Sequence, residues 1–155
     1  GFVCRLALGT GLRLGELCRA QAADVKRLQL PGAVEAQWFL EVANTKSKRV
    51  RRVPLSPELV QEIRTRVGRL VPYAERSPGS FAKPVKRLTG IEDFHVHRMR
   101  HSFACSWCEQ GGNLAALQQI LGHASIETTQ RYARLSDEAV MREAQRLGRV
   151  SGVEA

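Results

Sequence analysis

Strand-like sequence is confined to one stretch of this chain, between residues 25 and 55, and helical patterns lie on both sides of it. Within this stretch the apolar residues form three clusters, over 25–30, 38–42 and 50–55, and turn residues lie between them at 31–32 and 44–48. Three short clusters joined by turns predict three strands that pair in antiparallel order. We therefore expect an α+β fold, mostly α, with a small three-stranded antiparallel sheet.

The helical segments are delimited by capping residues. Two helical pieces are expected up to about Ala20, separated by a turn at Gly9-Thr10-Gly11, so that the second begins near Leu12. Ser56 and Pro57 predict the start of another helix, with apolar residues at helical spacing as far as position 70. After residue 95, helices are predicted over 97–110, 113–121, 125–133 and 136–147.

The charge of the chain favours a polyanionic partner. Lys and Arg number 24 against 15 Asp and Glu, which gives a formal net charge of +9. Nucleic acid is the simplest partner for such a charge, although a solvated basic surface has the same composition. The length of 155 residues suits one domain. No apolar run could cross a bilayer and no signal-peptide pattern is present, so we expect a soluble, intracellular protein.

Metal chemistry is not expected from the ligand spacing. The four cysteines, Cys4, Cys18, Cys105 and Cys108, lack the spacing of a disulfide scaffold. His101, Cys105 and Cys108 would share one helix face, but no second pair of ligands accompanies them. Small thiols on an apolar helix face are usually core residues. The carboxylates form no spaced cluster that would hold two divalent ions, which disfavours a metal-dependent nuclease.

Basic residues at two predicted helix starts form a potential phosphate site. His97 and Arg100 are three positions apart, so they would project together near a helix N-terminus, where backbone N–H groups also favour an anion. Arg13 lies at a second helix start, and Glu16, one turn later, can pair with its guanidinium. Each arginine alone would be an ordinary surface residue, but together the two could clamp one phosphate.

Tyr132, nine positions after His123, is the candidate nucleophile. A tyrosine can attack a phosphodiester without metal or water if cations neutralise the phosphate and an acid protonates the leaving oxygen. Its ordinary pKa is about 10, so attack at neutral pH needs a nearby base or positive charge, for which His97 or His123 is available. The alternative is a tyrosine packed on an amphipathic helix. Its polar neighbours at 128–131 favour a ledge that faces a phosphate.

A basic turn over residues 44–49 joins the second and third predicted strands. A lysine of this turn, Lys46 or Lys48, could enter a groove and protonate the leaving 5′-oxygen. Other basic residues are expected to contact the DNA backbone. They are Lys48, Arg49, Arg51 and Arg52 on the hairpin, and Lys83, Lys86 and Arg87 on a short helix. A hairpin with a purely electrostatic role is the alternative.

Four separated segments resemble, in order and spacing, the motifs of the tyrosine recombinases, the phage integrase and Xer-like family. They are TGLRLGEL (10–17), TKSKRVRRVPL (45–55), HRMRHSFA (97–104) and LGHASIETTQRY (121–132). By this resemblance the catalytic residues are Arg13, Lys46, His97, Arg100, His123 and Tyr132, and Glu16 supports the first arginine. Two departures are Thr45, where glycine is frequent, and Met99, where leucine is commoner.

The resemblance implies that residues 1–155 form a recombinase catalytic domain, with the N-terminal core-binding domain and the first catalytic helix lying before Gly1. It implies site-specific recombination of double-stranded DNA through a 3′-phosphotyrosyl intermediate, as in phage integration and other mobile genetic elements, without metal or other cofactor. The full-length protein is expected to act as a tetramer on two DNA sites, in the cytoplasm of a bacterium and at its nucleoid. Two alternatives are a DNA-binding module without catalysis and a type IB topoisomerase-like enzyme that relaxes DNA.

Overall fold

The computed structural model describes residues 1–29, 31–32, 34–43, 50–73, 78–123, 125–130 and 144–145. They belong to two compact units, Gly1–Phe103 and Ala104–Ala155, and the boundary lies within helix α5 (Val96–Glu109). The predicted basic turn and most of the predicted helix over 136–147 lie outside the described residues. No helix of the described ranges is long and apolar enough to cross a membrane.

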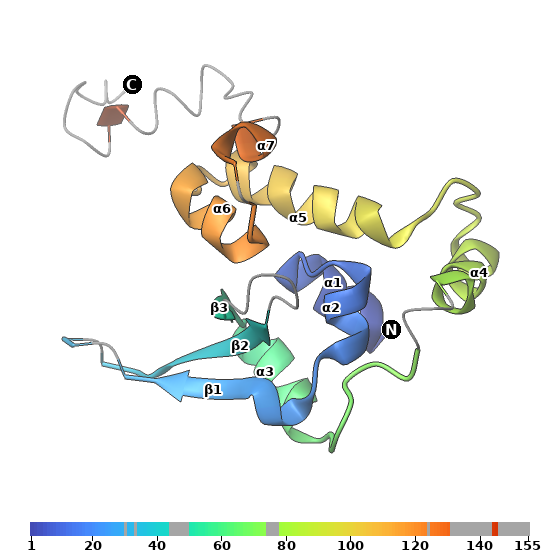
Figure 1. Ribbon diagram of the computed structural model, residues 1–155, viewed down its shortest axis with the longest axis horizontal. Coiled ribbons are helices and arrows are strands. Elements are labelled where there is room, and N and C mark those ends of the chain that lie inside the picture. Colours follow the sequence, from blue (N-terminus) through green and yellow to red (C-terminus); the bar gives the residue numbers. More distant parts are fainter. Residues whose placement is uncertain are drawn as a thin grey trace, which may run out of the picture. The chain divides into compact units, whose positions relative to one another are not determined.

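The sheet of the first unit confirms the predicted strands. A short 3-10 helix, η1 (Ala22–Asp24), leads into β1 (Val25–Leu28), which is followed by β2 (Gln37–Ala43) and β3 (Val50–Pro54). The strands are antiparallel, and β2 lies in the centre (Figure 1). Leu40 of β2 lies opposite both Val25 and Val53, and the side chains of Leu40 and Val53 are fully buried. The predicted α+β class with a three-stranded antiparallel sheet is therefore confirmed.

Helix α1 (Phe2–Thr10) extends further than its glycine content suggests. The predicted turn at residues 9–11 is wrong for its first two positions, since α1 continues through Gly9 and Thr10. A Cβ atom at Gly9 would lie 2.7 Å from Cδ1 of Leu59 in helix α3 (Pro57–Arg64), so glycine permits close packing here rather than a turn. Arg5 and Glu62 join the same two helices through a bidentate ion pair with distances of 2.7 Å.

Helix α3 begins as predicted and ends earlier than predicted. The Ser56 hydroxyl accepts a hydrogen bond from the Leu59 N–H at 3.4 Å, so Ser56 caps the helix. After Arg64 the chain leaves the helix, and Val67, which had been expected on its apolar face, is 97% exposed. Leu70 is nevertheless buried, although it lies outside the helix. Its N–H donates to the carbonyl of Ala20 at 2.9 Å, which holds this segment next to the end of α2 (Leu14–Arg19).

Helix α4 (Pro78–Thr89) carries the predicted basic cluster of Lys83, Lys86 and Arg87. One aromatic side chain anchors it. The ring of Phe81 lies 5.4 Å from that of Tyr73 and 6.1 Å from that of Phe94, and Phe81 is buried. This anchor fixes α4 beside the segment that leads into α5.

The second unit contains the end of α5 and the helices α6 (Leu114–Leu121) and α7 (Ile126–Gln130). The predicted helix over 113–121 is confirmed, because Asn113 Oδ1 accepts hydrogen bonds from the N–H groups of Ala115 and Ala116, at 2.9 and 3.1 Å. Gly122 ends this helix in the left-handed conformation, with φ 64°.

The cysteines are free thiols. Within the described part of the chain, no group of three or more metal-ligating side chains comes together, and this includes the predicted helix face of His101, Cys105 and Cys108. Burial, followed by the neighbouring Cys105 and Glu109, raises the pKa of the Cys108 thiol. Cys108 is therefore a protonated, buried side chain at neutral pH.

Candidate active site

Arg13 is the residue immediately before helix α2, and the local sequence places it there. Gly11 has a left-handed conformation (φ 61°) that ends α1, so the chain turns before Arg13. The Glu16 carboxylate accepts a hydrogen bond from the Arg13 backbone N–H at 2.8 Å and caps the new helix. The prediction that Arg13 lies within the first turn is wrong by one position, because α2 begins at Leu14.

The Arg13 side chain is oriented by Glu16 and remains accessible. Its Nη1 lies 3.2 Å from Glu16 Oε1, which confirms the predicted pair, and 44% of the side chain is exposed. A guanidinium that is oriented by a carboxylate and still reached by solvent is suited to binding a phosphate, since its planar N–H groups match phosphate oxygens.

Glu16 has a second partner that sequence reasoning missed. Arg51 of β3 donates from Nη1 and Nη2 to the two carboxylate oxygens of Glu16, at 2.8 and 2.7 Å. Both side chains are largely buried, with 7% of Glu16 and 13% of Arg51 exposed. Arg51 was predicted to contact DNA as part of the basic hairpin, whereas the geometry favours a role in fixing Glu16. The two residues are 35 positions apart, so no local pattern indicated the pair.

The ionisation of Glu16 depends on these partners. Burial acts to raise the pKa of its carboxyl, but the hydrogen bonds from the Arg51 side chain and the Arg13 backbone, with the charges of both arginines, outweigh it. The net result is a pKa below the ordinary value, so Glu16 is a carboxylate at neutral pH. The start of α2 is thereby tied to the first residues of β3.

Arg100, in the second turn of α5, is a buried cation. It is 1% exposed, and its Nη1 donates to the Gly11 carbonyl at 2.7 Å. This bond places the Arg100 guanidinium beside the turn that precedes Arg13. The two predicted ligands differ in exposure, since His97 is exposed and Arg100 is enclosed.

His97, in the first turn of α5, experiences the charge of both arginines. Partial desolvation of its imidazole, and then the positive charges of Arg100, His95, His101 and Arg13, lower its pKa below the ordinary value of about 6.5. His97 is therefore neutral at pH 7, with one ring nitrogen able to donate and the other able to accept a hydrogen bond.

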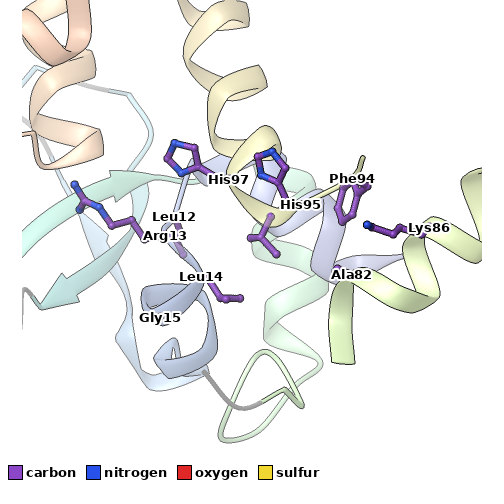
Figure 2. Close-up of a pocket in the computed structure, with 10 residues that line it drawn as sticks. Leu12, Arg13, Leu14, Gly15, Ala82, Lys86, Phe94, His95 and His97 are labelled. Atoms are coloured by element: carbon purple, nitrogen blue, oxygen red, sulfur yellow. The ribbon is translucent and has the colours of Figure 1, made fainter. Parts of the chain in front are cut away.

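A pocket of about 630 Å³ opens between α2, α4 and the start of α5 (Figure 2). Arg13 and His97 line it together, which places the predicted phosphate ligands of two separate motifs at one cavity. The other lining residues are Leu12, Leu14, Gly15, Ala82, Lys86, Phe94, His95 and Val96. The described lining thus contains four basic side chains, several apolar side chains and no carboxylate. Such a lining is suited to binding an anion.

In the second unit, His123 is held by a threonine. Its Nδ1 lies 2.9 Å from the hydroxyl oxygen of Thr129 in α7, and Thr129 is fully buried. The expectation that residues 128–131 form an exposed ledge is therefore wrong for Thr129. This contact fixes the orientation of the His123 ring.

The remaining predicted residues divide into two groups. Lys46, Lys48, Arg49 and Tyr132 lie outside the described residues, and their roles stay predictions. The other predicted DNA contacts, Arg52, Lys83, Lys86 and Arg87, are exposed. Arg52 also lies over the ring of Phe39, with its guanidinium carbon 4.9 Å from the ring centre.

Comparison with known proteins gave consistent matches. The model of the phage integrase family matches residues 2–139. The integrase of Escherichia phage 186 is 34% identical over 140 residues, which are 88% of this chain and 38% of that protein. The tyrosine recombinase XerA of Pyrococcus furiosus is 31% identical over 151 residues, which are 87% of this chain and 50% of that protein. The chain therefore spans half or less of the length of these relatives.

Solved structures agree with the sequence matches. The catalytic domain of bacteriophage HP1 integrase is 30% identical with a TM-score of 0.71, and the match covers 100% of this chain and 85% of that one. A crystal structure of XerA recombinase is 27% identical with a TM-score of 0.62, covering 90% of this chain and 55% of that one.

Proposed function

Because this chain belongs to the phage integrase family, we propose that it is the catalytic part of a site-specific recombinase that cuts and rejoins double-stranded DNA. The observation that carries the proposal is the shared pocket of Arg13 and His97, with the Arg100 guanidinium anchored beside the turn before Arg13. Three cationic or polar groups from two motifs thus gather where a phosphate can be neutralised.

In the proposed reaction, the phenolic oxygen of Tyr132 attacks the scissile phosphorus and the bond from phosphorus to the 5′-oxygen breaks. The phosphate becomes esterified to the tyrosine at the 3′ end of the DNA strand. Lys46 gives a proton to the leaving 5′-oxygen, with Lys48 as the alternative donor. The proton of the tyrosine passes to a base, for which His97, neutral at pH 7, and His123 are the candidates. Attack by a 5′-hydroxyl of a partner strand reverses these steps and exchanges the strands.

The cations act on the transition state. Arg13 and Arg100 offset the negative charge that grows on the non-bridging oxygens, and the two histidines donate hydrogen bonds to the same oxygens. Each bond broken is replaced by one of the same kind, so the proposed cycle uses no nucleotide and no metal ion. We further propose that the full-length protein acts in the cytoplasm, as a tetramer that joins two DNA sites.

The test is formation of a covalent protein–DNA complex. The chain is incubated with a library of nicked duplexes that carry a randomised arm, so that the short cut fragment diffuses away and attached DNA is trapped. After denaturation, protein of reduced mobility is recovered and its DNA is sequenced. Covalent product is expected for the unmodified chain, and its recovered sequences would identify the preferred site.

The chain offers a matched control, since it has two tyrosines. Tyr132→Phe should abolish the covalent product and leave DNA binding intact, while Tyr73→Phe, at a ring that packs on Phe81, should retain the product. Covalent product from Tyr132→Phe would rule out Tyr132 as the nucleophile. DNA binding without covalent product in every variant would support the binding-only module, and relaxation of supercoiled DNA without recombinants would support the topoisomerase-like reaction.

A further inference from the structure

The pocket beside Arg13 is larger than one phosphate requires, and its lining is also basic away from Arg13. Lys86 extends from α4 toward the segment that holds Phe94 and His95, and in this view the two imidazoles lie between Lys86 and Arg13 (Figure 2). The cavity volume of about 630 Å³ is several times the volume of one phosphate group, and neighbouring phosphates of a DNA strand are only one nucleotide apart. The cavity therefore has room for two successive phosphates.

We propose that Lys86 and His95 form a second phosphate subsite, which binds the phosphate next to the one held by Arg13 and His97. The inference rests on the proposed function, since it assigns a further part of the same DNA strand to the same pocket. It separates Lys86 from the other basic residues of α4, which have so far been grouped with it as general DNA contacts.

The position of Lys86 on α4 supports this assignment. Lys86 and Ala82 are four residues apart, so they share one helix face, and both line the pocket. Lys83 and Arg87 are on the same helix but do not line it. The aromatic contacts of Phe81 with Tyr73 and Phe94 hold α4 against the segment that carries His95.

The electrostatics of the pocket also favour a second anion. In the described ranges, the Lys86 ammonium has no carboxylate within ion-pair distance. Apolar side chains of the same pocket, Leu14, Phe94 and Val96, reduce the local polarity, and this strengthens the attraction between the cations and a phosphate. These apolar side chains also provide a surface that the sugar between two phosphates can contact.

Two short probes separate the subsites. The thymidine dinucleotide TpT has one phosphate, and pTpT has a second phosphate at its 5′ end. Each is titrated into the 155-residue chain while the imidazole signals of His95 and His97 are followed by NMR. We expect both probes to shift the His97 signal and pTpT to shift the His95 signal as well. We expect pTpT to bind about tenfold more tightly, as one charge-assisted contact predicts.

The variants test which cation is responsible. In Lys86→Met the affinity ratio of pTpT to TpT should fall close to one, whereas Lys83→Met, three residues away on the same helix, should keep the ratio of the unmodified chain. Thermal unfolding of both variants checks that α4 is retained. An unchanged ratio in Lys86→Met, or an equal fall in Lys83→Met, would overturn the second subsite. If neither dinucleotide shifts His97, the phosphate site of the proposed function fails as well, so the two failures are distinguishable.

Discussion

Glu16 links three parts of the site, because its carboxylate binds the Arg51 guanidinium, the Arg13 guanidinium and the Arg13 backbone N–H. Removing one member of a buried ion pair leaves the other charge without compensation. The structural and chemical roles of Glu16 are thus inseparable: the residue that stabilises the start of α2 also orients the cation that would bind phosphate.

Replacing Glu16 with Gln should destabilise the chain by about 3 kcal/mol at pH 7, since the buried Arg51 loses its counter-charge. Urea denaturation measures this change. Glu62→Gln removes the carboxylate of an exposed ion pair with Arg5 and should have little effect, so it is the control. Equal stability losses in the two variants would contradict the assigned role of burial.

The pH dependence follows from the lowered pKa of Glu16. The carboxylate of Glu16 stays ionised to lower pH in the folded state than in the unfolded state. Its contribution to the free energy of unfolding is therefore complete above the unfolded pKa. That contribution is lost as the pH falls through the folded pKa. Denaturation midpoints of the unmodified chain should therefore decline more steeply in the acid range than those of Glu16→Gln.

His97 should titrate below about 6.5, because desolvation and neighbouring positive charges disfavour the imidazolium. An NMR titration of its ring signals measures the pKa directly. As the pH falls, the unfolded state binds a proton at this histidine before the folded state does. The free energy of unfolding should therefore decrease as the pH falls from 6.5 toward the folded pKa of His97. Arg13→Gln should raise the pKa of His97, and Arg5→Gln, on α1, should leave it unchanged. Added phosphate should also raise it, and a fall on phosphate addition would contradict binding beside the ring.

At the scale of elements, the short helix α7 is coupled to the loop that carries His123. The bond between Thr129 and the His123 ring joins a helix of five residues to the turn after α6. Such a short helix has little stability of its own, so side-chain contacts of this kind determine its position. The chain continues from α7 to the proposed nucleophile two positions later.

Thr129→Val should test this coupling, because valine has nearly the shape of threonine but no hydroxyl. We expect a loss of about 1 kcal/mol in stability, a changed ring environment of His123, and reduced covalent complex with retained DNA binding. Thr65→Val, which removes an exposed hydroxyl that donates to the Glu62 carbonyl, is the control and should behave like the unmodified chain. Full activity of Thr129→Val would show that the His123 ring needs no support from α7.

Local chemistry explains which elements the sequence predicted well. Asn113 and Gly122 delimit α6 because capping depends on residues within one turn of the helix end. Gly9 was misjudged, since its reason is a neighbour on α3, far away in sequence. The pairing of Arg51 with Glu16 was missed for the same reason. Thr129 was misjudged because five helical residues are too few to define a buried face.

At the scale of the whole molecule, the formal charge of +9 should make DNA binding strongly dependent on salt. If about six phosphates are contacted, affinity for a duplex should fall by about a thousandfold between about 50 and 200 mM salt. Fluorescence anisotropy at several salt concentrations measures the slope. A duplex with uncharged methylphosphonate linkages is the control and should bind weakly at every concentration. An affinity that does not change with salt would contradict phosphate recognition.

The four motifs that resemble the tyrosine recombinases extend over most of the chain, and the family match and the fold both agree with them. Such motifs were readable because catalytic chemistry restricts residue types more than packing does: few side chains replace an arginine that must bind a phosphate. The relative positions of residues that are distant in the sequence, such as Arg51 and Glu16, could not be predicted, since they depend on contacts that no single segment specifies.

The enclosed guanidinium of Arg100 has a practical consequence for the design of an inactive variant that still binds the proposed DNA substrate. Its hydrogen bond to the Gly11 carbonyl makes this side chain part of the scaffold, so an inactive form prepared by truncating it would also risk loosening the junction between the first two helices. Under the proposed mechanism Arg13, with nearly half of its side chain in solvent, is the better position at which to make an inactive but folded protein.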